Sequence, residues 1–188
     1  MTGTGSLEFI KLHGLGNDFV LINEIDGDRF PEADRAKLAS RLCDRHAGIG
    51  GDGVLFIGRR DGEMTFRIFN ADGSEAEMCV NGIRCAAIAL KLKLAPEIGD
   101  EVEISTRGGK VKTEVRELSG NTGTVQVQTY FDPKYLGHKV IEVEGVSLDY
   151  HLVNVGNPHA VAFVEESVSE VAVEKIGHAL EHHEEFPE

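Results

Sequence analysis

Basic side chains are scarce in this sequence of 188 residues. Lys and Arg number 19 against 32 Asp and Glu, which gives a formal net charge of -13 at pH 7. Proteins that bind nucleic acid or anionic membrane surfaces do so through clustered Lys and Arg. The composition therefore argues against both kinds of partner, and an anionic substrate would have to be bound by local groups.

Long apolar runs are absent too. No stretch approaches the length of a transmembrane helix, and the opening residues MTGTGSLEFIK have neither the basic start nor the apolar stretch of a secretory signal. Cysteine is rare. The three present, an odd number without metal-type pairing, fit a reducing compartment better than a disulfide scaffold. We expect a cytoplasmic protein.

Metal-ligand spacing is missing as well. The eight histidines and three cysteines show no HxxxH or CxxC spacing together with the remaining ligands that a zinc site needs. His182 and His183 lie in the tail EHHEEFPE, which is typical of a solvated helix end. The sequence therefore predicts no metal site.

What is present suffices for a folded core, since 41% of the residues are hydrophobic. Strands are expected at residues 7–12 and 19–25, on either side of the glycine-rich turn HGLGND. One helix is expected to begin at Pro31 and to end before DRHAGIGGDG, and a last helix should span roughly residues 169–182. Further strands are expected at residues 54–57, 64–68, 102–106, 110–117, 123–131 and 139–145.

Cys79 is the most informative residue, because it lies where an Asp72-Gly73 turn meets a long apolar helix. The helical spacing that follows places Cys79 in a first, uncapped turn, and its apolar residues surround nearly the whole helix, which suits a helix enclosed by a sheet. Unpaired N–H groups and the helix dipole there favour thiolate and lower a cysteine pKa, whereas Glu75 and Glu77 would oppose this if they lie near. The apolar residues that recur at helical spacing after Cys79 are Ile83, Ala86, Ala87, Leu90 and Leu94.

Free cysteines are more often buried, small apolar residues than reactive groups. We prefer that interpretation for Cys43 and Cys85, which fall inside predicted helices, and the functional one for Cys79. The run GIGGDG, residues 48–53, lacks the Lys and Ser/Thr of a P-loop and does not join a strand to a helix. We expect it to form a loop that packs near the Cys79 turn.

A short repeat divides the chain. Gly16-Asn17 followed by an apolar strand recurs as Gly156-Asn157, an offset of 140 positions, and each copy precedes a helix that ends in a His-bearing segment. Fixed-offset similarity indicates two copies of one supersecondary unit. The same offset added to Cys79 falls beyond Glu188, so we expect the second copy to be incomplete.

Four segments, in order, resemble the diaminopimelate epimerase family: FIKLHGLGNDFVLIN, LCDRHAGIGGDGVLFI, FRIFNADGSEAEMCVNGIRCAA and NVGNPHAVAFV. The resemblance implies an α+β fold of two related domains, each a barrel-like, mostly antiparallel sheet around a central helix, with the active site in the cleft between them. It places the first domain at residues 1–118 and an incomplete second domain at residues 119–188.

The resemblance also implies an activity, the conversion of LL-diaminopimelate to the meso form on the route to lysine and peptidoglycan, without a cofactor. Two cysteines, one from each domain, exchange protons on opposite faces of the substrate. Cys79 matches the first catalytic cysteine, and His159 matches a histidine that tunes the thiols. The positions that match substrate-binding residues are Asn17, Asn70, Val80, Asn81 and Asn157.

The chain departs from the family in two places. The family usually has Cys-Gly-Asn-Gly where this chain has Val80 after Cys79, which puts a β-branched side chain where backbone approaches the ligand. The second catalytic cysteine has no counterpart before Glu188. We therefore expect these 188 residues alone to be inactive as an epimerase.

Other interpretations stay open. The asparagines could serve ordinary turn chemistry, which is the preferred interpretation of Asn157 from its local sequence alone. The chain could be a non-catalytic binding module or half of a split protein, in which case we expect a homodimer or a complementing C-terminal segment. It could also invert a different amino acid, or be a cysteine hydrolase that uses Cys79 and His159.

Overall fold

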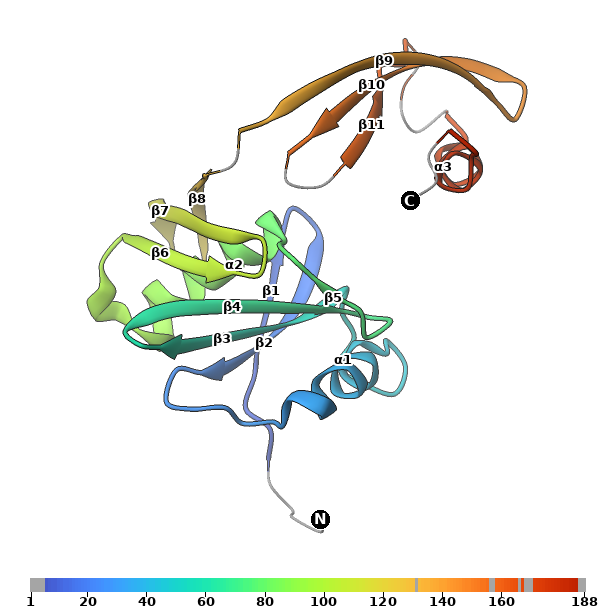
Figure 1. Ribbon diagram of the computed structural model, residues 1–188. Coiled ribbons are helices and arrows are strands. Elements are labelled where there is room, and N and C mark those ends of the chain that lie inside the picture. The colour runs from blue at the N-terminus through green and yellow to red at the C-terminus, as the bar shows by residue number, and fades with distance from the viewer. Residues whose placement is uncertain (1–5, 131, 156–157, 166, 168–170, 186–188) are drawn as a thin grey trace. The chain divides into compact units, whose positions relative to one another are not determined.

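The computed structural model describes residues 6–130, 132–155, 158–165, 167 and 171–185. The chain divides into two compact units, Met1–Tyr130 and Phe131–Glu188 (Figure 1). Both units combine a sheet with helices, and most neighbouring strands are antiparallel. The fold is therefore α+β, as expected.

An eight-stranded sheet forms the first unit, in the order β1-β2-β3-β4-β6-β7-β8, with the short strand β5 paired to β4. Two of its pairs are parallel, β2 with β3 and β4 with β6, so each needs a crossover connection. Helix α1 supplies the first crossover and α2 the second. The strands are β1 (Ile10–Gly14), β2 (Asn17–Glu24), β3 (Gly53–Arg60), β4 (Glu63–Asn70), β5 (Glu75–Ala76), β6 (Glu101–Thr106), β7 (Gly109–Ser119) and β8 (Thr122–Thr129).

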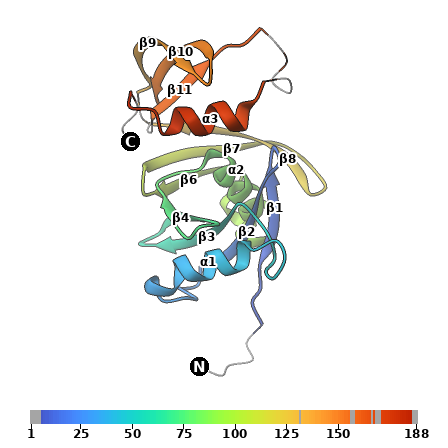
Figure 2. The same cartoon turned by 90° about the vertical axis from the view of Figure 1, so that its right-hand side faces the viewer.

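Helix α2 (Val80–Ala89) lies inside the curl of this sheet (Figure 2). It contacts strands at both ends of the sheet, β1 and β2 as well as β7 and β8. Ile83, Ala86 and Leu90 pack in one buried cluster with residues such as Leu55 and Phe66 from the strands. The expectation of a helix enclosed by a sheet is confirmed, and burial of one such side chain contributes about 1.5–3 kcal/mol.

Helix α1 (Arg35–Cys43) covers the opposite face of β3 and β4. A 3-10 turn (Glu32–Asp34) precedes it, with Pro31 in the capping position. Arg35, the first residue of this helix, is buried, and its guanidinium lies 2.8 Å from the Glu24 carboxylate and 4.5 Å from the Phe56 ring centroid. Pairing offsets the cost of burying that charge.

The described residues of the second unit form a three-stranded antiparallel sheet in the order β11-β10-β9 with one helix against it. Ile176, Ala179 and Leu180 of the helix pack against Ile141 and Tyr150 of the sheet. The strands are β9 (Lys134–Val143), β10 (Val146–Asn154) and β11 (Pro158–Ala162), and the helix is α3 (Val173–Glu181).

The first motif copy lies in the β1–β2 hairpin, where Gly14 pairs with Asn17, whereas Gly156 and Asn157 of the second copy fall outside the described residues. Asn154 and Pro158, on either side of that second copy in the chain, pair as the ends of β10 and β11. A helix follows each hairpin. The strand β8, which begins after the expected domain boundary at residue 118, pairs with β7 inside the first unit, so the division between units falls at residue 130.

No helix among the described residues is long and apolar enough to span a membrane.

Candidate functional site

Cys79 is the N-cap residue of α2. Its backbone is extended (φ -143°, ψ 109°), its carbonyl accepts the Ile83 N–H at 2.9 Å, and its Sγ accepts the Gly82 N–H at 3.4 Å. We expected Cys79 inside an uncapped first turn. The structure corrects this by one residue, because the sulfur itself caps the helix and so receives a backbone donor.

Asn17 faces the same sulfur from the β1–β2 hairpin. Its side-chain oxygen Oδ1 lies 3.9 Å from Cys79 Sγ and accepts Asn81 Nδ2 at 3.3 Å. The sulfur therefore has a donor on one side, the Gly82 N–H, and an acceptor on the other, Asn17 Oδ1. A thiolate uses the donor and a thiol uses the acceptor, so both protonation states find a partner, as a group that gives and takes protons requires.

A loop before β3 holds Asn17 in this orientation. Asp52 Oδ2 accepts Asn17 Nδ2 at 2.7 Å and the Asp18 backbone N–H at 2.9 Å. Arg45 bridges the two acids, at 2.7 Å from Asp18 and 2.8 Å from Asp52, and Lys11 lies 2.6 Å from Asp18. The hydrogen bonds from Arg45, then those from Lys11, hold the pKa of Asp18 well below its usual range. The GIGGDG loop thus packs near the Cys79 turn, as expected.

Two glycines allow close packing at the start of α2, one against the β1–β2 hairpin and one against the core. A Cβ at Gly14 would lie 3.1 Å from the Asn81 carbonyl oxygen, so a side chain there would push the hairpin from the helix start. A Cβ at Gly82 would lie 3.0 Å from Leu55 Cδ2 and 3.1 Å from Phe66 Cζ. Gly82 therefore seats the first turn of α2 against the core.

The carboxylate of Glu75 does not act as an unpaired negative charge near the thiol. It lies 2.6 Å from the Arg67 guanidinium and 3.0 Å from that of Arg107. The hydrogen bond from Arg67 holds the pKa of Glu75 below its usual value, so the carboxylate is ionised and paired. The backbone of Glu77 accepts the Gly108 N–H at 3.0 Å.

Arg84 adds a cation to the first turn of α2. Its Nη2 donates to Asn81 Oδ1, while Asn81 Nδ2 donates to Asn17. The chain Arg84, Asn81, Asn17 and Asp52 is therefore continuous, with Cys79 beside it. Val80 is 40% exposed, so it lies at the surface of the helix start rather than in the core.

Asn70 closes β4 and is engaged in its own turn. Its side chain donates to Ser74 Oγ at 3.0 Å, its backbone N–H donates to the Ser74 carbonyl at 2.8 Å, and Asp72 accepts the Ser74 N–H at 2.8 Å. This is turn chemistry of the kind expected for Asn near an Asp-Gly pair. Its role toward a substrate stays a prediction.

The remaining predicted site residues belong to the second unit. His159 lies on β11, where it pairs with Val153 of β10, and it lines a cavity of about 420 Å³ together with Pro158 and Leu180. Asn157 falls outside the described residues. The roles predicted for both stay predictions.

Cys43 and Cys85 are buried, each 4% exposed, as expected for structural thiols. Burial raises the pKa of Cys43, and burial together with the nearby Cys79 raises the pKa of Cys85 to about 11. Both therefore stay protonated and shielded at neutral pH. Neither thiol is therefore available for proton transfer.

Sequence reasoning missed the charged residues that hold the site. The signals for Asp18 and Asp52 were the dipeptides Asn-Asp and Gly-Asp in glycine-rich turns, which we interpreted as turn formers. Nothing in the local sequence pairs Arg45 with either acid, because Asp18 is 27 positions away in the chain. Only the parallel pairing of β2 and β3 brings the two loops together.

Comparison with known proteins identifies the family of this chain. The family model described as diaminopimelate epimerase matches residues 9–130. A diaminopimelate epimerase of Gloeothece citriformis is 39% identical over 203 residues, covering 97% of this chain and 68% of that protein. One from Methanocaldococcus jannaschii is 36% identical over 211 residues, covering 97% of this chain and 70% of that protein.

Solved structures agree on the fold. A phenazine biosynthesis protein of the PhzF family from Bacillus anthracis matches with a TM-score of 0.63 at 15% identity, over 92% of this chain and 62% of that one. A probable proline racemase from Agrobacterium radiobacter matches with a TM-score of 0.59 at 16% identity, over 92% of this chain and 53% of that one. The sequence matches, which cover nearly the whole chain, show that it belongs to the diaminopimelate epimerase family of isomerases.

Proposed function

We propose that this chain carries Cys79 as one of two proton-transfer groups that convert LL-diaminopimelate to meso-diaminopimelate, a step toward lysine and peptidoglycan. The observation that carries the proposal is Cys79 Sγ at the N-cap of α2, between the Gly82 N–H and Asn17 Oδ1. The match to diaminopimelate epimerases over 97% of this chain supports the choice of substrate.

The chemistry follows from that position. The Cys79 thiolate takes the proton from one α-carbon, the S–H bond forms as the C–H bond breaks, and the electron pair moves into the adjacent carboxylate. The N–H groups of the first turn of α2, including that of Asn81, stabilise the developing charge on this carboxylate. A second group on the opposite face then gives a proton to the same carbon, which inverts it.

Asn17, Asn70 and Asn157 hold the amino and carboxylate groups of diaminopimelate in this proposal, and His159 tunes the thiols. Asn17 is the best supported, because Asp52 fixes its amide while its oxygen lies next to Cys79. In this proposal the backbone dipoles of α2 stabilise the negative charge that develops on the substrate carboxylate, and the reaction uses no pyridoxal and no metal.

Neither of the other two thiols in these 188 residues can serve as the second proton-transfer group. Cys43 lies in α1, and Cys85 lies within the α2 that Cys79 caps; both are buried with raised pKa. We therefore expect the isolated chain to exchange the α-proton of the substrate on one face and not to invert the carbon.

The test follows LL-diaminopimelate by proton NMR in D2O with the purified chain. We expect loss of the α-proton signal, caused by deuterium, without formation of the meso isomer. The variant Cys79→Ser should lose this exchange, because serine is a far weaker acid than cysteine, whereas Cys85→Ser should keep it if its fold is intact by circular dichroism. Exchange that survives in Cys79→Ser would refute the role of Cys79, and meso product from the isolated chain would refute the need for a second group.

Substrate choice needs a separate comparison, since a matching structure is a probable proline racemase and Val80 replaces the usual glycine. We expect exchange with diaminopimelate to exceed that with proline or hydroxyproline by at least an order of magnitude. The reverse order would indicate an epimerase of another amino acid. If no substrate exchanges, size-exclusion chromatography with and without a complementing C-terminal segment distinguishes a binding module or split protein, which should form a dimer or complex.

A further inference from the structure

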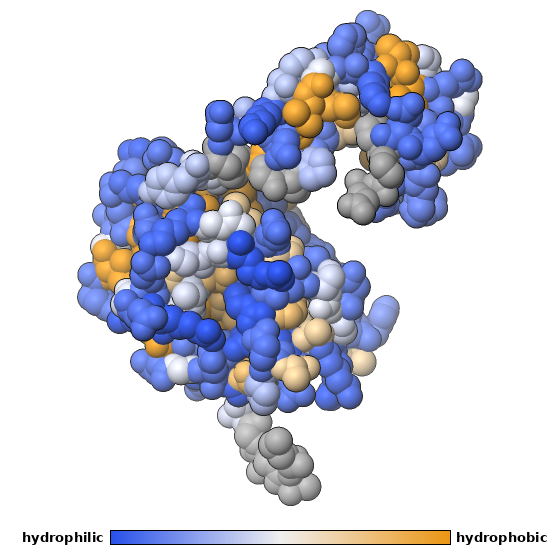
Figure 3. Space-filling view, in the orientation of Figure 1, coloured by the Kyte–Doolittle hydropathy of each residue, from blue (hydrophilic) through white to orange (hydrophobic). Residues whose placement is uncertain are grey.

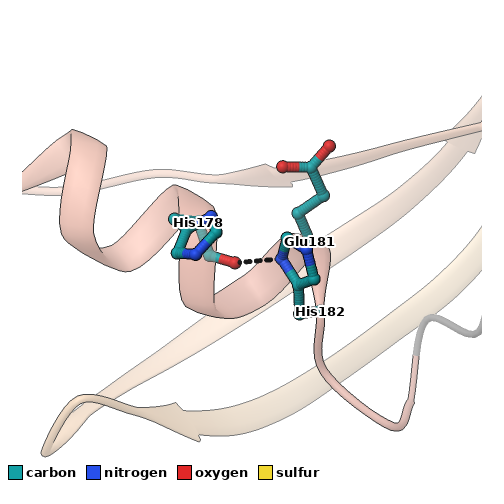
Figure 4. A group of neighbouring side chains, drawn as sticks. All are labelled: His178, Glu181 and His182. Atoms are coloured by element: carbon teal, nitrogen blue, oxygen red, sulfur yellow. Dashed lines mark hydrogen bonds between the residues drawn. The ribbon is translucent and has the colours of Figure 1, made fainter.

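The last turn of α3 carries three side chains of ligand type on the surface of the second unit. His178, Glu181 and His182 are all exposed, and each offers one ligand atom within 4.8 Å of the other two (Figure 4). The spacing explains the grouping, because positions i, i+3 and i+4 of a helix share one face. The two imidazole rings lie with their centroids 4.5 Å apart.

A hydrogen bond orients one of the rings. His182 Nδ1 lies 2.9 Å from the carbonyl oxygen of His178, the last residue but three of the helix (Figure 4). A carbonyl only accepts, so Nδ1 carries the proton and Nε2 keeps its lone pair. Metal-ligating histidines are typically held this way, with the second nitrogen donating to a backbone carbonyl or carboxylate.

The position at the end of a helix favours a cation. The carbonyl groups of the last turn of α3 point toward this end of the helix and make it the negative end of the helix dipole. Glu181 contributes a carboxylate to the group itself, and the chain as a whole has a net charge of -13. The acidic neighbour Glu185 is engaged with Lys139, so it does not compete as a ligand.

The donor set selects the ion. Two imidazole nitrogens and one carboxylate suit borderline ions such as Zn²⁺, Co²⁺, Ni²⁺ and Cu²⁺, whereas Mg²⁺ and Ca²⁺ prefer oxygen ligands. Bonds of about 2.0–2.1 Å place the ligand atoms of a tetrahedral zinc roughly 3.4 Å apart. All three residues are exposed, so small side-chain movements can bring the ligand atoms to that spacing, and water can complete the coordination.

We propose that His178, Glu181 and His182 form a surface site for a divalent transition ion of the Zn²⁺ type. This goes beyond the expectation of no metal site, which rested on finding no HxxxH spacing accompanied by further ligands. His178 and His182 have that spacing, and Glu181 supplies a third ligand on the same helix face. The site belongs to the second unit and is independent of the reaction proposed at Cys79.

Isothermal titration of the full chain with Zn²⁺ tests the site, in a Cys79→Ser background that removes the competing thiolate. We expect one equivalent to bind, and either His178→Ala or His182→Ala to weaken binding about tenfold or more. Glu181→Gln keeps the size of the side chain and removes its charge, so it should weaken binding by a smaller factor. His183→Ala is the matched control and should change the affinity less than twofold.

Two further readouts separate ligation from a structural effect. Ni²⁺ or Cu²⁺ should broaden the NMR signals of the His178 and His182 rings before those of the other histidines, and circular dichroism should show α3 unchanged in every variant. Stoichiometric binding that is equally tight in His178→Ala and His182→Ala, or no binding by the parent chain, would overturn the proposal.

Discussion

Leu15 has a left-handed backbone at the tip of the β1–β2 hairpin, next to the site residue Asn17. Its φ is 55°, in the region that only glycine adopts without cost, and its side chain is 91% exposed, so it gains almost nothing from burial. Gly16 completes the turn with φ 91°. This geometry is typical of a tight hairpin turn, for which glycine or asparagine would be preferred at both positions.

We expect Leu15→Gly to raise the free energy of unfolding by about 1 kcal/mol, because the left-handed backbone costs an L-residue about 1–2 kcal/mol. Urea denaturation measures the change. Leu136→Gly is the matched control, since Leu136 is also exposed but lies in strand β9, where glycine should destabilise. If Leu15→Gly destabilised the protein or lowered the rate of proton exchange without unfolding it, the leucine would have a role in binding.

At the scale of single residues, the sequence located the helix start that Cys79 caps and missed the groups that surround it. The apolar spacing after Cys79 located the helix start to within one residue, because periodicity is a local property of the chain. The orientation of Asn17 depends on Asp52, which is 35 positions away, and no local pattern reports such a pair.

The element that carries Cys79 is a crossover helix. Because α2 connects β4 to the parallel strand β6, it is enclosed by the sheet that it joins, and its first turn is fixed by packing rather than by a strong capping residue. The enclosure was predictable from an apolar residue on nearly every side of the helix. The charge network around Asp18 was not predictable, because it depends on which loops the parallel pairing of β2 with β3 brings together.

Gly82→Ala tests how tightly the first turn is seated. The new Cβ would lie about 3.0 Å from a buried Leu55 methyl group, and these neighbours are packed on all sides, so overpacking should outweigh the better helix propensity of alanine. We expect a net loss of about 1 kcal/mol in unfolding free energy and slower proton exchange at Cys79.

Gly177→Ala is the matched control in the other helix. A Cβ there meets nothing within 4 Å, so alanine should stabilise α3 by about 0.5–1 kcal/mol. Thermal or urea unfolding of both variants supplies the comparison. Stabilisation by Gly82→Ala would mean that the core yields and that α2 is not held by close contact.

On the scale of the whole molecule, negative charge dominates. Hydrophilic side chains cover most of the face seen in Figure 3, and the net charge of -13 at pH 7 is spread over a chain with a sequence pI of about 5.0. Many individual acids are paired, yet the excess is not, so the folded state carries net self-repulsion at neutral pH.

We expect added salt to stabilise the protein at pH 7 and not at pH 5. Raising NaCl from about 0.01 M to about 0.15 M shortens the screening length from roughly 30 Å to 8 Å, which weakens repulsion between separate charges more than attraction within close pairs. Near pH 5 the net repulsion disappears and screening weakens mainly the ion pairs. Melting temperatures at both pH values measure the effect, and equal salt responses would contradict it.

The division of the chain was harder to predict than its elements. We expected a boundary after residue 118, and the compact units meet after Tyr130, because β8 pairs with β7 in the first unit. Alternating strand patterns look alike on either side of such a boundary. Which sheet a strand joins depends on partners that lie elsewhere in the sequence. The assignment of residues 119–188 to an incomplete second copy stays a prediction.

Because the sulfur of Cys79 accepts the Gly82 N–H, the proton transfer that we propose for it and the integrity of the helix start depend on one atom. A covalent inhibitor attached to that sulfur would block it and deprive the first turn of its acceptor together. The inactivated protein should then be recognisable by a loosened segment that proteases cleave more readily than in the untreated enzyme.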